Sequence, residues 1–234
     1  MKFEVLAGKI AAGVANSKDY TDWAMELLEQ GSDSENIAIL AGLCFDKYPD
    51  SFEVRDYFNR CLDELGLILP TGDEVILYYA KYICEQIIKG GIPPRDGASA
   101  LYHIGIDFGW QGIYSMWLYL EEDIESLRYD EGYYLFNTGL NKQNIDQYII
   151  KEAEQFLIIT GMTLPDDFFS LCLCEKCGYL GKCMLRPLRI VEILTSRNWV
   201  YGGKIAICRM CGDTHLLSMG DHVGREVFLK KVNL

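Results

Sequence analysis

The sequence lacks the features that mark membrane and secreted proteins. Its apolar runs are far shorter than the roughly 20 residues that a membrane-spanning helix needs. Glu4 and Lys9 interrupt the stretch that would form the apolar part of a signal peptide, so residues 1–16 predict a short amphipathic helix instead. We therefore expect no membrane span and a cytoplasmic protein.

Histidines and the common catalytic motifs are also scarce. The chain has three histidines, and it contains no phosphate-binding loop, nucleophile elbow or dinucleotide fingerprint. His103 lies in an apolar helical stretch, which predicts a packed side chain rather than a general base. We expect the protein not to be an enzyme, while the many carboxylates leave an acid/base pair open as an alternative.

Acidic residues are unevenly distributed. Residues 1–165 contain 27 Asp and Glu against 12 Lys and Arg, a net charge of -15, whereas residues 166–234 contain 7 against 10, a net charge of +3. Such asymmetry favours two modules, 1–165 and 166–234, with different surfaces. The acidic module should repel nucleic acid and attract basic partners.

The residue pattern changes at the same place. Apolar residues recur at helical spacing before Pro165, as in Asp19–Gly31 and Ser51–Gly66, and predict six to eight helices in a multi-helix bundle or a short αα repeat. An offset of 34 residues relates Leu6 to Leu40 and Trp23 to Tyr57, which fits paired-helix repeats. After Pro165, short β-branched segments predict strands, including residues 225–234. The fold class is therefore α+β.

Four of the nine cysteines share one local pattern. Cys174 and Cys177 are separated by two residues and followed by glycine, and Cys208 and Cys211 repeat this arrangement. Two residues between thiolates let one tight turn present both sulfurs to a single metal ion, and the glycine closes the turn. Without a secretion signal, cysteines serve as thiols or metal ligands more often than as disulfides.

These paired CxxCG turns resemble the zinc-ribbon family over about residues 172–234. The resemblance implies a small β-rich module around a structural Zn²⁺ held by four thiolates, with no open position for a reacting water. The 30 residues between the turns exceed the compact ribbon spacing, which predicts an inserted strand or a longer hairpin. Cys172, Cys183 and His215 stay open as substitute ligands, and Cys44, Cys61 and Cys84 are expected in the helical core.

One helical segment combines aromatic and acidic residues. Its aromatic stripe is explained either by burial or by a partner surface, in which aromatic anchors supply affinity and acidic residues steer a basic protein. The candidate partner-binding residues are Trp110, Trp117, Glu121, Glu122, Asp123 and Glu125.

The helical part also resembles a group of small helical bacterial proteins, some of the immunity-protein type. The likeness rests on Leu6–Ile10, Asp22–Leu43 and Tyr79–Ile104. It implies a non-enzymatic protein that binds another protein. Our leading hypothesis is thus a bacterial interaction protein with a structural zinc site, which as an immunity protein would cover a basic toxin. The alternative is a zinc-ribbon regulatory protein whose C-terminal cations contact nucleic acid.

Overall fold

The chain forms two compact units. The computed structural model describes residues 1–108, 112–129, 136–188, 200–201 and 204–232, with only the backbone described at 200–201. The units are Met1–Ile83 and Cys84–Leu234, and their boundary falls within one helix. In the described ranges, eight α-helices precede Pro165 and every strand follows it, which confirms the predicted α+β layout.

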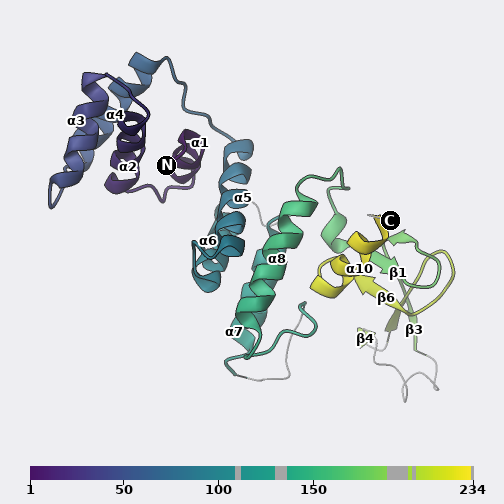
Figure 1. Ribbon diagram of the computed structural model, residues 1–234. Coiled ribbons are helices and arrows are strands. Elements are labelled where there is room, and N and C mark those ends of the chain that lie inside the picture. The colour runs from purple at the N-terminus through teal and green to yellow at the C-terminus, as the bar shows by residue number, and fades with distance from the viewer. Residues whose placement is uncertain (109–111, 130–135, 189–199, 202–203, 233–234) are drawn as a thin grey trace. The chain divides into compact units, whose positions relative to one another are not determined.

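The first unit is entirely helical in its described residues (Figure 1). Its elements are α1 (Phe3–Ala11), α2 (Ser17–Glu29), α3 (Glu35–Gly42), the 3₁₀ turn η1 (Leu43–Phe45), α4 (Ser51–Leu65) and the beginning of α5 (Asp73–Lys89). An asparagine or aspartate precedes both α2 and α4 and accepts a backbone N–H bond there, which satisfies an otherwise unpaired donor. The two helices start 34 residues apart, the offset noted in the sequence.

Aromatic rings from α2 and α4 form the centre of this unit. Trp23 is 2% exposed and meets Phe58 edge-on, with 5.3 Å between ring centroids. Tyr20 meets the same Phe58 ring at 4.9 Å. Leu6, Ile37 and Leu40 fill the remaining space and are fully buried. The unit therefore has a complete apolar core of its own.

The second unit contains helices and two small sheets. Its further helices are α6 (Pro94–Phe108), α7 (Ser115–Ser126), α8 (Ile145–Ile159), the 3₁₀ turn η2 (Phe168–Ser170) and α10 (His222–Val232). The strands are β1 (Cys172–Cys174), β2 (Leu180–Gly181), β3 (Met184–Pro187), β4 (Val200–Tyr201), β5 (Lys204–Ile207) and β6 (Leu216–Ser218). They form two antiparallel sheets with the orders β2-β1-β6 and β3-β5-β4.

The first of these sheets shares its core with helices. Leu171 and Leu173 pack with Ile159 of α8 and Leu229 of α10 in one buried cluster. The change from helices to strands near residue 165 thus falls inside the second unit. Helix α8 precedes this change in the sequence, and the sheet follows it. The predicted division into modules 1–165 and 166–234 stays a prediction.

Helix α10 corrects the strand predicted for residues 225–234, of which 233–234 lie outside the described residues. The Asp221 carboxylate accepts from the Val223 N–H at 3.0 Å and caps the helix, and Lys230 pairs with Glu226 one turn away at 2.7 Å. Gly224 lies so close to the Ser218 carbonyl of β6 that a Cβ atom would clash with it. Figure 1 shows α10 beside α8 and next to β1 and β6.

A buried ion pair fastens α10 to α8. Arg225 and Glu152 are both fully buried, and their side chains form a salt bridge. Arg225 also donates to the carbonyls of Met219 and Gly220, at 3.0 and 2.7 Å, so its charge is well compensated. Burial alone would raise the pKa of Glu152, but Arg225 and then His222 outweigh that effect and hold it below the ordinary value of 4.5.

Two more side chains complete this network. His222 Nδ1 lies 2.7 Å from Glu152 Oε2, and Arg225 Nε donates to Gln155 Oε1 at 3.0 Å. The amide nitrogen of Gln155 must then face His222, where it donates to the backbone carbonyl at 3.2 Å. Each of these four buried side chains is therefore satisfied by the others.

Glu152→Gln should destabilise the second unit by about 3 kcal/mol at pH 7, because it leaves Arg225 buried without a counter-charge. The loss should show in urea unfolding followed by circular dichroism. A group whose pKa is depressed on folding stabilises the fold above its unfolded pKa. The difference between the two chains should thus be complete above about pH 4.5 and shrink as the pH falls further.

Glu154→Gln is the matched control, because Glu154 lies on the same helix but is exposed. Its unfolding curve should coincide with that of the wild type. Equal stability of the Glu152 variant and the wild type at pH 7 would contradict a stabilising role for the pair.

Candidate metal centre

The four cysteines singled out by their spacing converge in space. One sulfur from each of Cys174, Cys177, Cys208 and Cys211 lies within 4.8 Å of all the others. Two sulfur pairs, Cys174–Cys211 and Cys177–Cys208, are 3.6 Å apart. That is much longer than the roughly 2.05 Å of a disulfide. It is close to the edge of about 3.8 Å expected for a tetrahedron with zinc–sulfur bonds of about 2.3 Å.

Two equivalent backbone turns present these sulfurs. In the first, Cys174 N–H donates to the Tyr179 carbonyl at 2.9 Å and Gly178 N–H donates to the Cys174 carbonyl at 2.9 Å. In the second, the same two bonds join Cys208 with Asp213 and Gly212 with Cys208, at 2.7 and 2.9 Å. Both glycines have a positive φ, 74° and 72°, which a side chain would strain.

The turns connect the two sheets. Cys174 ends β1 of the first sheet, whereas Cys208 directly follows β5 of the second. After the second turn the chain enters β6, which returns to the first sheet beside β1. The cluster thus lies where the chain passes from one sheet to the other, and an ion held there would link them.

The four sulfurs differ in exposure and acidity. Cys174 and Cys208 are buried, and Cys177 and Cys211 are exposed. Desolvation would raise the pKa of Cys208. This effect is outweighed by hydrogen bonds from the backbone N–H groups of Cys211 and Met210 and by the neighbouring thiols, which lower that pKa to about 7. A hydrogen bond from the Asp213 backbone N–H lowers the pKa of Cys211. Desolvation and the three other thiols outweigh this effect and raise the pKa of Cys211 to about 12. Four thiolates therefore need a cation to coexist at neutral pH.

Polar side chains contact one another at the second turn. Asp213 accepts from the His215 backbone N–H at 2.9 Å and lies 2.8 Å from its ring nitrogen Nδ1. These contacts, first the backbone bond and then the side chain, lower the pKa of Asp213 to about 2. The Lys176 ammonium lies 3.5 Å from the same carboxylate. A charge-based contact therefore joins the first turn to the second.

The three substitute ligands lie outside the cluster that the described residues form. Cys172 is buried at the start of β1, with the Cys183 thiol as a neighbour. Burial and this neighbour raise the pKa of Cys172 to about 12. His215 is 70% exposed and interacts with Asp213. The geometry thus favours the four cysteines of the two turns.

The five described residues among the predicted partner residues differ in burial. Trp117 and Asp123 are buried, with Trp117 packed against Phe156 at 5.9 Å between ring centroids. Asp123 accepts hydrogen bonds from the backbone N–H groups of Phe136 and Asn137. Glu122 is exposed, Glu121 and Glu125 are half-buried, and Trp110 lies outside the described residues. Of the five described candidates, the three glutamates are the ones accessible to a partner.

Two other sequence predictions are corrected by side-chain placement. Cys61 and Cys84 are buried as expected, but Cys44 is exposed, because it lies in the turn η1 beyond the end of α3. His103 is exposed on α6 rather than packed in the core, and its ring lies edge-on to Tyr102. Helical spacing alone did not distinguish the outer face from the inner one at these positions.

The buried network of Glu152, Gln155, His222 and Arg225 has no signature in the local sequence pattern. It places a histidine beside a carboxylate, an arrangement that can create a general base. Here His222 Nε2 lies 3.4 Å from the Gln155 amide nitrogen, which is its donor end. Both imidazole nitrogens therefore have a polar neighbour within this buried network.

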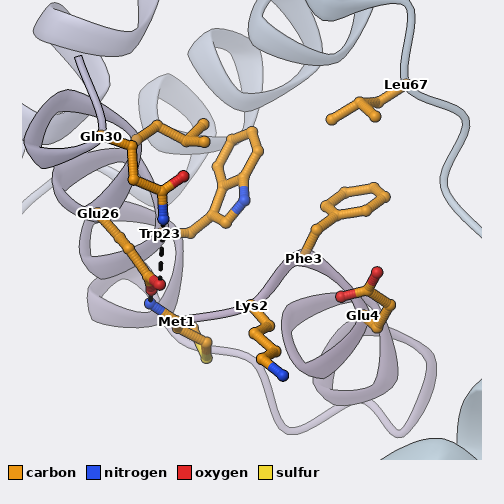
Figure 2. Close-up of a pocket in the computed structure, with 9 residues that line it drawn as sticks. Met1, Lys2, Phe3, Glu4, Trp23, Glu26, Gln30 and Leu67 are labelled. Carbon is orange, nitrogen blue, oxygen red and sulfur yellow. Dashed lines mark hydrogen bonds and ion pairs between the residues drawn. The ribbon is translucent and has the colours of Figure 1, made fainter. Parts of the chain in front are cut away.

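The first unit contains a small cavity of about 250 Å³. Phe3, Trp23 and Leu67 form its apolar wall (Figure 2). The Glu26 carboxylate pairs with the Met1 ammonium, and Figure 2 shows Glu4 on the other side of the opening. The Glu26 carboxylate of this cavity is therefore already paired with a positive charge.

Comparisons with protein-family models, curated proteins and solved structures found no match. No helix in the described part of the chain is long and apolar enough to cross a membrane. The fold and the site together define an α+β protein with a four-cysteine cluster arranged to bind a metal ion.

Cys177→Ser should weaken metal binding by more than the roughly tenfold loss typical of changes around a metal's ligands. The measurement is titration of the full chain with Co²⁺, whose sulfur-to-cobalt absorption reports thiolate ligands. Cys172→Ser is the matched control and should bind Co²⁺ like the wild type, because Cys172 lies outside the cluster of four sulfurs. Equal loss in both variants would contradict the assignment of the four ligands.

Proposed function

We propose that the protein is a non-enzymatic interaction protein in which one structural Zn²⁺ shapes the C-terminal part and an acidic helical surface binds a basic protein. The convergence of four thiols from two CxxCG turns carries the first half of this proposal. Four sulfur ligands in a tetrahedral arrangement suit zinc.

The ligand number supports a structural ion. A catalytic zinc keeps one coordination position for water or substrate, whereas four thiolates fill all positions. When bound, the ion would supply a crosslink between the two sheets and no reaction chemistry. Because the described strands have only two to four residues each, this crosslink would provide a large part of their folding free energy.

The distribution of charge supports the second half. The first unit has 15 acidic and 7 basic residues, a net charge of -8 within 83 residues. A field of that sign accelerates association with basic proteins and opposes association with nucleic acid. An immunity protein that covers a basic toxin is the narrower form of this proposal. A reducing cytoplasm is the proposed compartment, because it would keep the thiols available to a metal.

The nucleic-acid alternative receives less support from the C-terminal cations. Arg225 is buried, and Lys176, Lys182 and Lys230 each pair with a carboxylate. Lys204 and Arg209 are exposed, while Arg189 and Arg197 lie outside the described residues. Several of the described C-terminal cations are therefore buried or partly neutralised by a carboxylate.

Protein purified without added metal should contain one zinc ion per chain by elemental analysis, and its removal by a chelator should abolish the β signal while helical circular dichroism is largely retained. The helices of the first unit carry none of the four cysteines, so they provide the internal control. Iron in place of zinc, or an unchanged fold after complete metal removal, would contradict a structural zinc.

The full chain used as bait in a lysate of its host should retain a basic protein after nuclease treatment, and less of it at high salt. Mass spectrometry identifies the retained protein and its isoelectric point. Retention of nucleic acid that disappears with nuclease, with no basic protein left, would favour the alternative function.

A further inference from the structure

Three aromatic rings lie exposed in a short stretch of the first unit. Phe45 and Tyr48 are each 84% exposed, and Phe52 is 81% exposed. Isolated apolar residues on a surface are ordinary, but several large ones within eight residues are typical of a binding surface. We call residues 45–52 the aromatic segment. The core of the unit is built on other rings, Trp23 and Phe58 among them, so these three are not needed for it.

The aromatic segment is fixed at both ends. At its beginning, Leu43 is buried, and its carbonyl accepts from the Asp46 N–H at 3.2 Å. At its end, Asp50 caps α4 by accepting from the Phe52 N–H at 2.9 Å, and Val54 anchors the first turn of the helix in the core. A surface held in this way loses little conformational entropy when a partner binds.

Carboxylates accompany the rings. Asp46 and Glu53 are exposed, and among the described residues neither has an ion-pair partner. Asp56, one turn further along, pairs with Arg60 at 2.6 Å. The Lys47 ammonium lies 5.4 Å from the centre of the Tyr48 ring, so a cation already occupies a position over one of these aromatic faces.

We propose that the aromatic segment is the docking site for a basic protein segment that carries Lys or Arg together with a large apolar side chain. The apolar side chain would pack among Phe45, Tyr48 and Phe52, while the cations pair with Asp46 and Glu53 or lie over the rings. This inference rests on the proposed function and assigns its partner surface to the first unit rather than to the candidate residues of α7.

Charge argues against the other occupants of such a surface. Anionic lipid headgroups and nucleic acid would meet a unit with a net charge of -8, and so would a second copy of this unit. A basic polypeptide is the occupant for which the apolar and the electrostatic contributions have the same sign.

The test is the fluorescence anisotropy of a labelled peptide of lysines and leucines titrated with the full chain. A lysine/serine peptide and a glutamate/leucine peptide of equal length separate charge from apolar contact. The wild type should bind the lysine/leucine peptide most tightly. Joint replacement of Phe45, Tyr48 and Phe52 by Ala should weaken that binding by about tenfold or more. Asp46→Asn with Glu53→Gln should weaken it less and reduce its salt dependence.

Tyr129→Ala is the matched control, because Tyr129 is an equally exposed ring, 89%, in the second unit. It should bind the peptide like the wild type. All variants should keep the wild-type helical circular dichroism, since the replaced side chains are exposed.

Each contrary outcome has a distinct meaning. Equal binding by the triple alanine variant and the wild type would overturn the docking site and leave a basic partner in place. Failure of the wild type to bind the lysine/leucine peptide would overturn both the docking site and the proposed partner class. Equal binding of the glutamate/leucine peptide would reduce the segment to nonspecific apolar contact. A dimer in sedimentation that the triple variant loses would make a second copy the occupant.

Discussion

The convergence of four sulfurs on one point is the constraint on which the C-terminal part depends. Strands of two to four residues bury little apolar surface, and outside the buried strand β1 several of their side chains, such as Met184 and Leu185, are about half exposed. Such strands do not supply the free energy to order two sheets. A cation bound between Cys174 of β1 and Cys208, which follows β5, would supply this free energy. It would neutralise the repulsion among four thiolates and form a bond with each of them.

The sulfur cluster does not act alone, because α10 joins the first sheet to α8. Gly224 allows the helix to approach β6, Leu229 enters the buried cluster with Leu173, and Arg225 reaches Glu152 on α8. The two interactions differ in kind: the ion pair is buried and requires ionised Glu152, whereas the metal site requires deprotonated sulfur. Acid would weaken both, the metal site by protonating sulfur and the ion pair by protonating Glu152 at a pH below 4.5.

The sequence predicted most of this arrangement where a local pattern carries the information. Cysteine spacing with glycine identified the two turns, since their geometry is set within six residues, and apolar periodicity identified the helices. It failed where the decisive contact is remote in sequence. Residues 225–232 were predicted as a strand from their β-branched residues, yet the cap at Asp221 and the contact of Arg225 with Glu152, 73 positions away, favour a helix. Exposure of Cys44 likewise depends on where α3 ends and the turn η1 begins, which apolar spacing does not determine.

The two halves of the proposed function make different demands on the chain. A metal ion held by four thiolates would have no coordination position left for a partner's side chain. Two of the four cysteines, Cys177 and Cys211, are exposed to solvent. The first unit has the opposite character, with a complete aromatic core and three further rings that its stability does not need. Rings exposed at such cost in water are expected where a partner covers them. Since the surrounding carboxylates would repel any acidic surface, recognition of a basic protein reconciles the charge of the unit with its exposed aromatic residues.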